Sequence, residues 1–282
     1  MSTTTGIDLG EGGVHLAVVD NGAGRPRIEL LRSGTLASVR EGLAASDRVR
    51  LAVRDSDAIV KRLRLPSGRA EEREDRLVFE LTQALLDDGD DFRFLLQPTG
   101  DPERVIGAAV RKSLLPVLPE GSGLLAEGVV THRLRSVAVG QGYLGFCRRA
   151  EGTLMAVTEV GPRDAVVSLV AQDQIVDVAA LRHRCDDLSV RDQQERLAID
   201  IKTVVNFRLA ALLDQGLSQP LAGMVLWGDG VDDACRETVQ AYFPVGVSLP
   251  TVNAGYLAAE VAAEIPAEAL PGYLVALGLA VN

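Results

Sequence analysis

Two segments of this chain share one pattern, in which an apolar strand leads into an acid-x-glycine turn and a second apolar strand follows. In the first segment the turn residues are Asp8 and Gly10, and in the second they are Glu159 and Gly161. Alternating apolar residues predict strands at 6–9, 14–19, from 154 onward, at 165–170 and at 174–178. Because such a unit cannot bury its apolar face alone, its repetition predicts an internally duplicated α/β chain.

The first turn is rich in glycine, at Gly10, Gly12 and Gly13. Glycine permits positive φ and lets a bound group approach the backbone amides, as a phosphate-binding turn requires. Asp8 at its rim suits a hydrated divalent cation held through water. Glu11, however, places a second negative charge where phosphate would sit, and the two would repel each other. The turn is therefore predicted as either a phosphate loop or an ordinary hairpin.

A third glycine turn follows the apolar stretch 224–227, with the sequence Gly228-Asp229-Gly230, before a helix that begins near Val231. A turn of this kind lets a flat ring system lie close to the backbone. The alternative is a plain strand-to-helix connection.

Composition limits the class of protein. With 282 residues and 47% hydrophobic content, the chain is long enough for two domains or one split domain. A net charge of -10 argues against nonspecific binding to nucleic acid or anionic lipid. The three scattered cysteines indicate reduced thiols in the cytoplasm. We expect neither a signal peptide nor a membrane helix, so any membrane association must come through a partner.

The middle of the chain differs in its sequence pattern, with an alternating strand followed by a highly charged helix. This change predicts a small α+β insertion at 56–135, between a first part at 1–55 and a last part at 136–282. Strands are predicted at 27–31, 49–53, 59–66, 92–97 and 104–110, and helices at 38–45, 70–86, 113–118, 134–139, 190–213 and 273–281. Residues 124–133 are expected to return the chain to the larger domain. The helix at 70–86 has an apolar stripe and an acidic, solvent-facing side.

This order of elements resembles the actin-like ATPase superfamily. Within it, the chain is most similar to the PilM-like proteins of type IV pilus assembly, and next to the FtsA-like proteins. The motifs that carry the likeness are Gly6-Ile7-Asp8-Leu9-Gly10, the strand 59–66 before an acidic helix, the strand pair in 92–112, and Ala276-Leu277-Gly278-Leu279-Ala280. The resemblance implies an actin-like, ribonuclease H-like duplicated fold, with two subdomains around a cleft and a small inserted α+β subdomain.

The resemblance also implies a nucleotide cleft, and leaves ATP and Mg²⁺ open as ligands. Its candidate residues are Asp8, Gly10, Glu11, Gly12, Gly13, Glu159, Gly161, Gly228, Asp229 and Gly230, with Asp8 as the metal residue, acting through water. Three departures argue against phosphate: Glu11, the bulky Pro162-Arg163 after Gly161, and Asp229 between the glycines. Pro162 also lacks a backbone donor. We therefore expect a degenerate cleft.

The function expected from this resemblance is a cytoplasmic scaffold, peripheral to the inner membrane, in a type IV pilus or type II secretion-like platform. Its expected partner is the cytoplasmic tail of a PilN-like bitopic membrane protein, with self-association left open. The alternative is an active ATPase or phosphotransferase, in which Asp8 positions a metal-bound water or a substrate hydroxyl. His15, His132 and His183 have no catalytic partner identifiable from spacing.

Overall fold

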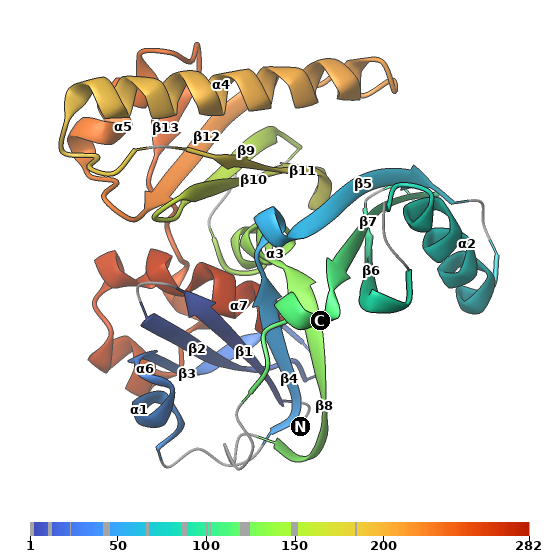
Figure 1. The fold of residues 1–282 in the computed structure, drawn as a ribbon. Helices are drawn as coiled ribbons and strands as arrows, with labels where there is room; N and C mark the ends of the chain where they lie inside the picture. The colour runs from blue at the N-terminus through green and yellow to red at the C-terminus, as the bar shows by residue number, and fades with distance from the viewer. Residues whose placement is uncertain are drawn as a thin grey trace.

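The computed structural model contains two five-stranded sheets, one above the other in Figure 1, and a three-stranded sheet beside them. It describes residues 3–10, 13–22, 24–41, 46–65, 68–85, 89–99, 101, 103–118, 125–147, 152–183 and 185–281. Among these residues, no helix is both long enough and apolar enough to cross a bilayer.

The first sheet has the strand order β3-β2-β1-β4-β8. Its strands are β1 (Thr3–Gly10), β2 (Gly13–Asp20), β3 (Arg27–Gly34), β4 (Ser46–Val53) and β8 (Leu125–Leu134). The first three are antiparallel, whereas β4 runs parallel to β1 and β8 parallel to β4. Alternation along the strands buries Ile7, Leu16 and Leu51 in one cluster, which fixes which face of the sheet is inside.

The second sheet repeats this topology, with the order β11-β10-β9-β12-β13. Its strands are β9 (Leu154–Val160), β10 (Asp164–Ala171), β11 (Gln174–Arg182), β12 (Leu221–Gly228) and β13 (Gly246–Ser248). Again three antiparallel strands are followed by two parallel ones. The predicted duplication is therefore confirmed, and β9 is the counterpart of β1. Helices α4 (Arg191–Leu213) and α5 (Asp233–Gln240) cover the outer face of this sheet.

Two helices lie between the sheets, α3 (Arg135–Phe146) and α7 (Leu274–Ala280). They pack so closely that a Cβ atom on Gly142 would lie 2.1 Å from the carbonyl oxygen of Leu274, and one on Gly278 would lie 1.7 Å from that of Ala138. The helix predicted at 134–139 is thus longer than expected. Glycine, which usually weakens a helix, is required within α3 by this contact.

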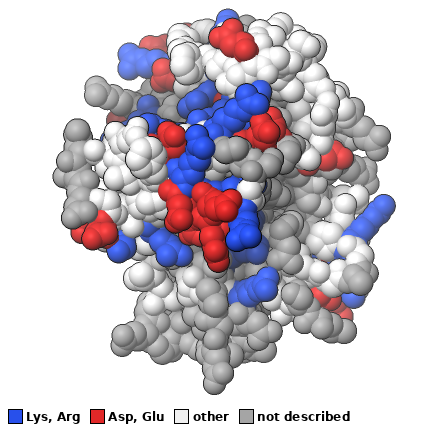
Figure 2. Space-filling view, turned by 90° about the vertical axis from the view of Figure 1, so that its right-hand side faces the viewer, with Lys and Arg blue, Asp and Glu red and all other residues white. Residues whose placement is uncertain are grey.

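The inserted residues form the third sheet, with the order β5-β7-β6, and one helix. Its elements are β5 (Ala58–Arg64), α2 (Ala70–Thr82), β6 (Phe92–Pro98) and β7 (Arg104–Arg111). Leu77 and Leu81 of α2 are buried against the sheet. Positively and negatively charged side chains lie side by side on the molecular face that includes the insert (Figure 2), so the face is not uniformly acidic.

The third sheet occupies 58–111 of the predicted 56–135 insertion. From Leu125 on, β8 pairs with β4 of the first sheet, so this part of the segment belongs to the first half by its hydrogen bonds. The helix predicted at 113–118 is wrong, because only a 3₁₀ turn, Lys112–Leu114, forms there. Leu115 is extended, as expected of a residue that precedes proline.

Two shorter helices complete the described chain. The helix predicted at 38–45 is α1 (Leu36–Arg40), which begins at a capping box between Thr35 and Ser38; residues 42–45 lie outside the described part. Helix α6 (Ala259–Glu264) lies near β3. It follows an isolated bridge between Leu257 and Ile28 that covers the outer edge of β3.

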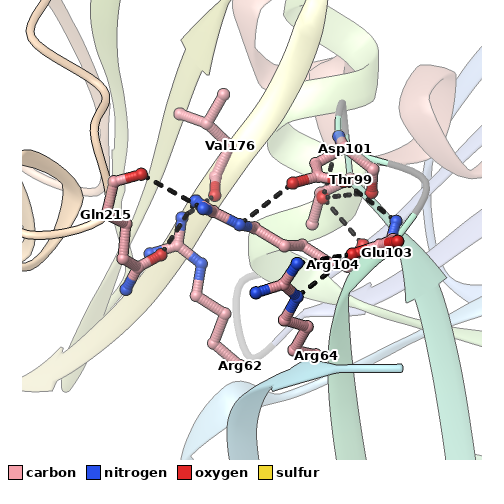
Figure 3. A network of polar contacts seen from close by, with 8 residues as sticks. All are labelled: Arg62, Arg64, Thr99, Asp101, Glu103, Arg104, Val176 and Gln215. Carbon is pink, nitrogen blue, oxygen red and sulfur yellow. Dashed lines mark hydrogen bonds and ion pairs between the residues drawn. The ribbon is translucent and has the colours of Figure 1, made fainter. Parts of the chain in front are cut away.

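The insert is also tied to the second half (Figure 3). Arg62 on β5 donates to the carbonyl oxygen of Val176 at 2.7 Å, and its guanidinium lies 3.4 Å from the Asp177 carboxylate. Arg104 on β7 donates to both the side-chain and the backbone oxygen of Gln215, each at 3.1 Å. These contacts hold the insert against β11 and the end of α4.

Candidate functional site

The two acids of the duplicated turns meet at one arginine. Asp8 lies on β1 and Glu159 on the equivalent strand β9, while Arg135 is the first residue of α3 between them. Arg135 Nη1 lies 2.6 Å from Asp8 Oδ1, and Nε and Nη2 each lie 2.8 Å from a Glu159 carboxylate oxygen. The contact with Glu159 is therefore bidentate. One guanidinium joins the two halves of the molecule.

Burial makes these charges depend on one another. Desolvation raises the pKa of the Asp8 carboxyl, the charge of Glu159 raises it further, and Arg135 only partly offsets this. Burial opposes the charge of Arg135, but the carboxylates of Glu159 and Asp8 outweigh that effect and raise the pKa of the guanidinium. Arg135 therefore stays positive, and its single charge faces two carboxylates.

A third buried acid, Asp55, positions Arg135. Asp55 accepts a hydrogen bond from the Ser136 backbone amide at 2.9 Å and also bonds the Ser136 hydroxyl. It thereby caps the N-terminus of α3, where an acid is favourable. Burial raises the pKa of Asp55 to about 6, although the bonds to Ser136 lower it. Because this cap fixes where α3 begins, it also fixes the place of Arg135.

Two adjoining cavities lie beside the bridge formed by Arg135. One, of about 930 Å³, is lined in part by Gly10, Arg135, Arg163 and Arg182. The other, of about 600 Å³, is lined in part by His183 and the turn 228–232. Gly161 and His183 border both, so the two form one cleft. Volumes of this size suit a small-molecule ligand.

The structure places most of the predicted site residues around this cleft. Asp8, Gly10, Glu159, Gly161, Gly228, Asp229 and Gly230 lie in the bridge or line a cavity. Gly13 pairs with Gly10 across the first hairpin. Glu11 and Gly12 lie outside the described residues, so the predicted repulsion by Glu11 stays a prediction.

Two backbone amides beside the cleft, one in the second turn and one in the third glycine turn, already donate within the chain. The Gly161 amide donates to the Asp164 carbonyl at 2.7 Å, and the Asp229 amide donates to the Val160 carbonyl at 2.8 Å. Pro162 has no amide hydrogen to offer. These two amides and Pro162 are therefore not available as donors for a bound phosphate.

The acids do not fit a metal ion either. Magnesium is usually held through one or two carboxylates, and here both candidate carboxylates are bonded to Arg135. In this structure Asp8 is paired with Arg135, and the expected metal role of Asp8 stays a prediction. In the described part of the chain, no group of three or more His, Cys, Asp or Glu side chains is placed to bind a metal.

Sequence reasoning missed three residues of this site: Arg135, Asp55 and His183. Arg135 is the one charged residue in the apolar stretch 134–139, a signal of a buried function. The Nδ1 atom of His183 accepts from the Cys185 amide at 3.3 Å, so Nε2 donates to the Gly161 carbonyl at 2.9 Å. His183 therefore supports the second turn.

Replacing Arg135 tests the bridge. We expect Arg135→Met to lower the free energy of unfolding at neutral pH by about 3–5 kcal/mol, because it leaves two buried carboxylates without their cation. Urea unfolding measures this loss. Arg163→Met removes an exposed arginine from the same cavity and is expected to change stability by no more than about 0.5 kcal/mol.

A triple variant separates charge from packing. If Asp8→Asn and Glu159→Gln are added to Arg135→Met, no buried charge is left unpaired, and we expect much of the lost stability to return. A triple variant as unstable as Arg135→Met alone would contradict the electrostatic account.

Asp55 predicts a pH dependence. Its folded-state pKa of about 6 lies above the ordinary value of 3.8. The protonated form is therefore favoured by folding, and the stability that this group contributes below pH 4 is lost as the pH rises through 6. Asp55→Asn mimics the protonated form. We expect the stability difference, variant minus wild type, to grow by about 2–3 kcal/mol between pH 4 and 7 in urea unfolding. Asp57→Asn, at a half-buried neighbour outside the cap of α3, is the matched control. A flat difference for Asp55→Asn would refute the assignment.

Comparison with known proteins shows likeness in structure only. No protein-family model and no curated protein matches the sequence. The solved structure described as the PilM-PilN type IV pilus biogenesis complex aligns with a TM-score of 0.70 and 16% identity, over 98% of this chain and 97% of that one.

Two further solved structures are similar. A Bacteroides thetaiotaomicron protein with an actin-like ATPase fold and unknown function aligns with a TM-score of 0.50 and 9% identity, over 88% of this chain and 91% of that one. The cytoplasmic domain of EpsL, an inner-membrane component of the Vibrio cholerae type II secretion system, aligns with a TM-score of 0.45 and 14% identity, over 88% and 85%. Together with the duplicated sheets around a cleft, the first two comparisons show that this chain has an actin-like ATPase fold with a small inserted α+β subdomain.

Proposed function

We propose that this chain is a non-catalytic actin-like scaffold of a type IV pilus or type II secretion-like inner-membrane platform. On this proposal it works in the cytoplasm and reaches the membrane by binding the cytoplasmic tail of a bitopic, PilN-like protein. The single observation that carries the non-catalytic part is the bond of Arg135 to both Asp8 and Glu159. Arg135 bonds to both carboxylate oxygens of Glu159 and to one of Asp8, so neither acid has two free oxygens with which to bind a metal ion or activate a nucleophile.

The structural likeness supports the choice of system. The PilM-PilN structure matches nearly the whole chain at a TM-score of 0.70, and its description names a complex of two components in pilus biogenesis. A scaffold with the role of PilM would need a partner with the role of PilN. We therefore infer a tail-binding role for this chain.

The proposed docking place is the end of the insert beside β8. Leu114 and Val117 are exposed apolar residues there, and Val117 is 73% exposed. The Pro116 carbonyl lies 2.9 Å from Nε2 of His132 on β8, which holds this segment next to the strand. In the described sheets β8 is an outer strand, so an extended tail can add to it through main-chain hydrogen bonds.

An active ATPase or phosphotransferase is the second candidate, and the size of the cleft favours it. The adjoining cavities of about 930 and 600 Å³ have room for a nucleotide. Turnover, however, would require Arg135 to leave Asp8 and Glu159. Binding and turnover of nucleotide therefore distinguish the two candidates.

Mg-ATP is the first test of the non-catalytic part. A ligand that binds only the folded state raises stability by about 2.7 kcal/mol at one hundred times its dissociation constant. We expect millimolar Mg-ATP to leave the melting temperature unchanged and to release no phosphate. A clear upward shift together with phosphate release would favour the enzyme.

Tail binding tests the scaffold itself. The probes are labelled peptides with the cytoplasmic tails of bitopic pilus and secretion proteins from the source organism, measured by fluorescence anisotropy. We expect one tail to bind, and the pair Leu114→Asp and Val117→Asp to weaken it about tenfold or more by removing apolar contacts. Phe79→Asp, at an exposed apolar position on α2, is the matched control and should bind normally. If no tail binds the wild-type chain, the scaffold proposal fails.

A further inference from the structure

A separate cavity lies where the insert meets the second half, away from the cleft. This cavity, called here the junction cavity, has a volume of about 230 Å³. The insert contributes Arg62 from β5 and Arg104 from β7 to its wall, and the second half contributes the turn between β10 and β11 and the end of α4. Small-molecule sites occur preferentially between two packed parts of a protein, as here.

Two guanidinium groups of the insert lie next to each other at the junction cavity (Figure 3). Arg62 donates to the Val176 carbonyl at 2.7 Å. Arg104 donates to the side-chain and backbone oxygens of Gln215, each at 3.1 Å. These acceptors are neutral, so they hold the two arginines in place without cancelling their charge.

The nearby acids compensate only part of the positive charge. The buried Asp177 carboxylate lies 3.4 Å from Arg62 and 4.0 Å from Arg208 of α4, so one acid serves two cations. The Asp101 carboxylate lies 3.0 Å from Nε of Arg104. Three guanidinium groups therefore share two carboxylates, which leaves one positive charge in excess.

The properties of Arg62 reflect this excess charge. Burial lowers the pKa of its guanidinium, Asp177 raises it, and the charges of Arg104 and Arg208 lower it further. In the described part of the chain, the buried Nε of Arg62 has no hydrogen-bond acceptor. Repulsion between like charges is relieved when an anion lies beside them. Both observations therefore favour a negatively charged ligand at this place.

The remaining wall sets the size and character of such a ligand. A water molecule takes up about 30 Å³ in the liquid, so the junction cavity has room for roughly eight non-hydrogen atoms. This is far fewer than a nucleotide has. One part of the wall is apolar and suits a short hydrocarbon body. The apolar side chains are Ala171, Val176, Leu212 and Leu217, and the neutral polar ones include Thr99, Gln172 and Gln174.

We propose that the junction cavity binds a small organic monocarboxylate, whose carboxylate pairs with Arg62 and Arg104 and whose body packs on the apolar wall. The planar fork of a guanidinium matches a carboxylate in shape, and one negative charge matches the excess of one positive charge. A phosphate ester carries a charge of about −1.5 to −2 at neutral pH and exceeds it. The inference does not depend on the pilus or secretion role.

Matched pairs of carboxylates and amides test the ligand class. The probes are butyrate with butyramide and benzoate with benzamide, titrated against the full chain and followed by saturation-transfer NMR. Each amide has the shape of its carboxylate but no charge. We expect each carboxylate to bind about tenfold or more tightly than its amide. Inorganic phosphate, added to the bound carboxylate, should compete poorly.

Three variants test the place of binding. Arg104→Gln removes one of the two cations, and Gln172→Glu adds a carboxylate to the wall while leaving the contacts of Arg62 and Arg104 intact. Each should weaken carboxylate binding about tenfold. Arg64→Gln is the matched control, because Arg64 lies on the same strand β5 but bonds to Glu103 at 2.7 Å outside the cavity (Figure 3). It should bind like the wild type.

Several results would overturn the proposal. They are the absence of binding by both carboxylates at millimolar concentration, equal binding of each carboxylate and its amide, and displacement by inorganic phosphate in preference to carboxylate. Wild-type affinity in Gln172→Glu would place any binding elsewhere, even if Arg104→Gln fails to fold. An equal loss in Arg64→Gln would show that the overall surface charge, rather than the junction cavity, attracts the carboxylate.

Discussion

The ion pair between Arg135 and the two acids is the contact on which the arrangement of the halves depends. Asp8 and Glu159 come from equivalent strands of two sheets, and neither strand touches the other in the described hydrogen bonding. Arg135 supplies the charge that lets both acids stay buried. Breaking a buried pair leaves an uncompensated charge, which costs several kcal/mol. The two halves are thus held together beside the cleft.

The duplication explains why the two acids meet, and some of the backbone amides around them are already hydrogen-bonded within the chain. Each half ends an antiparallel pair at the same place, so the two acid-x-glycine turns face the same cleft. In the second turn, the Gly161 amide bonds within the turn and Pro162 has none. His183 then closes the turn by donating to the Gly161 carbonyl. In the described cleft, the Gly161 and Asp229 amides, Arg135 and His183 all donate to other groups of the chain.

The sequence predicted this fold because its strands, turns and order are local patterns. Asp8, Glu159 and the glycine turns are also local, and the structure places them around one cleft. The role of Arg135 is not set by local sequence. It arises because Arg135 bonds to acids on two strands that lie far apart in the chain, and no sequence spacing reveals such a contact. The helix predicted at 134–139 was too short, because glycine usually weakens a helix, whereas Gly142 within α3 allows the close contact with α7. The helix predicted at 113–118 was wrong because Pro116 disfavours a helical conformation of the residue before it, Leu115.

The insert adds a second connection between the halves. Asp55, just before the insert, caps α3 in the cleft, and Arg62 and Arg104 from the insert bond to β11 and the end of α4 in the second half. Hinge closure around a ligand requires two bodies that separate freely. Here, opening would break the Arg135 bridge and would also break the contacts of the insert, leaving buried polar groups without partners. Two halves joined at two places can hold a bound tail at a fixed position, and this stiffness is what we expect a scaffold to need.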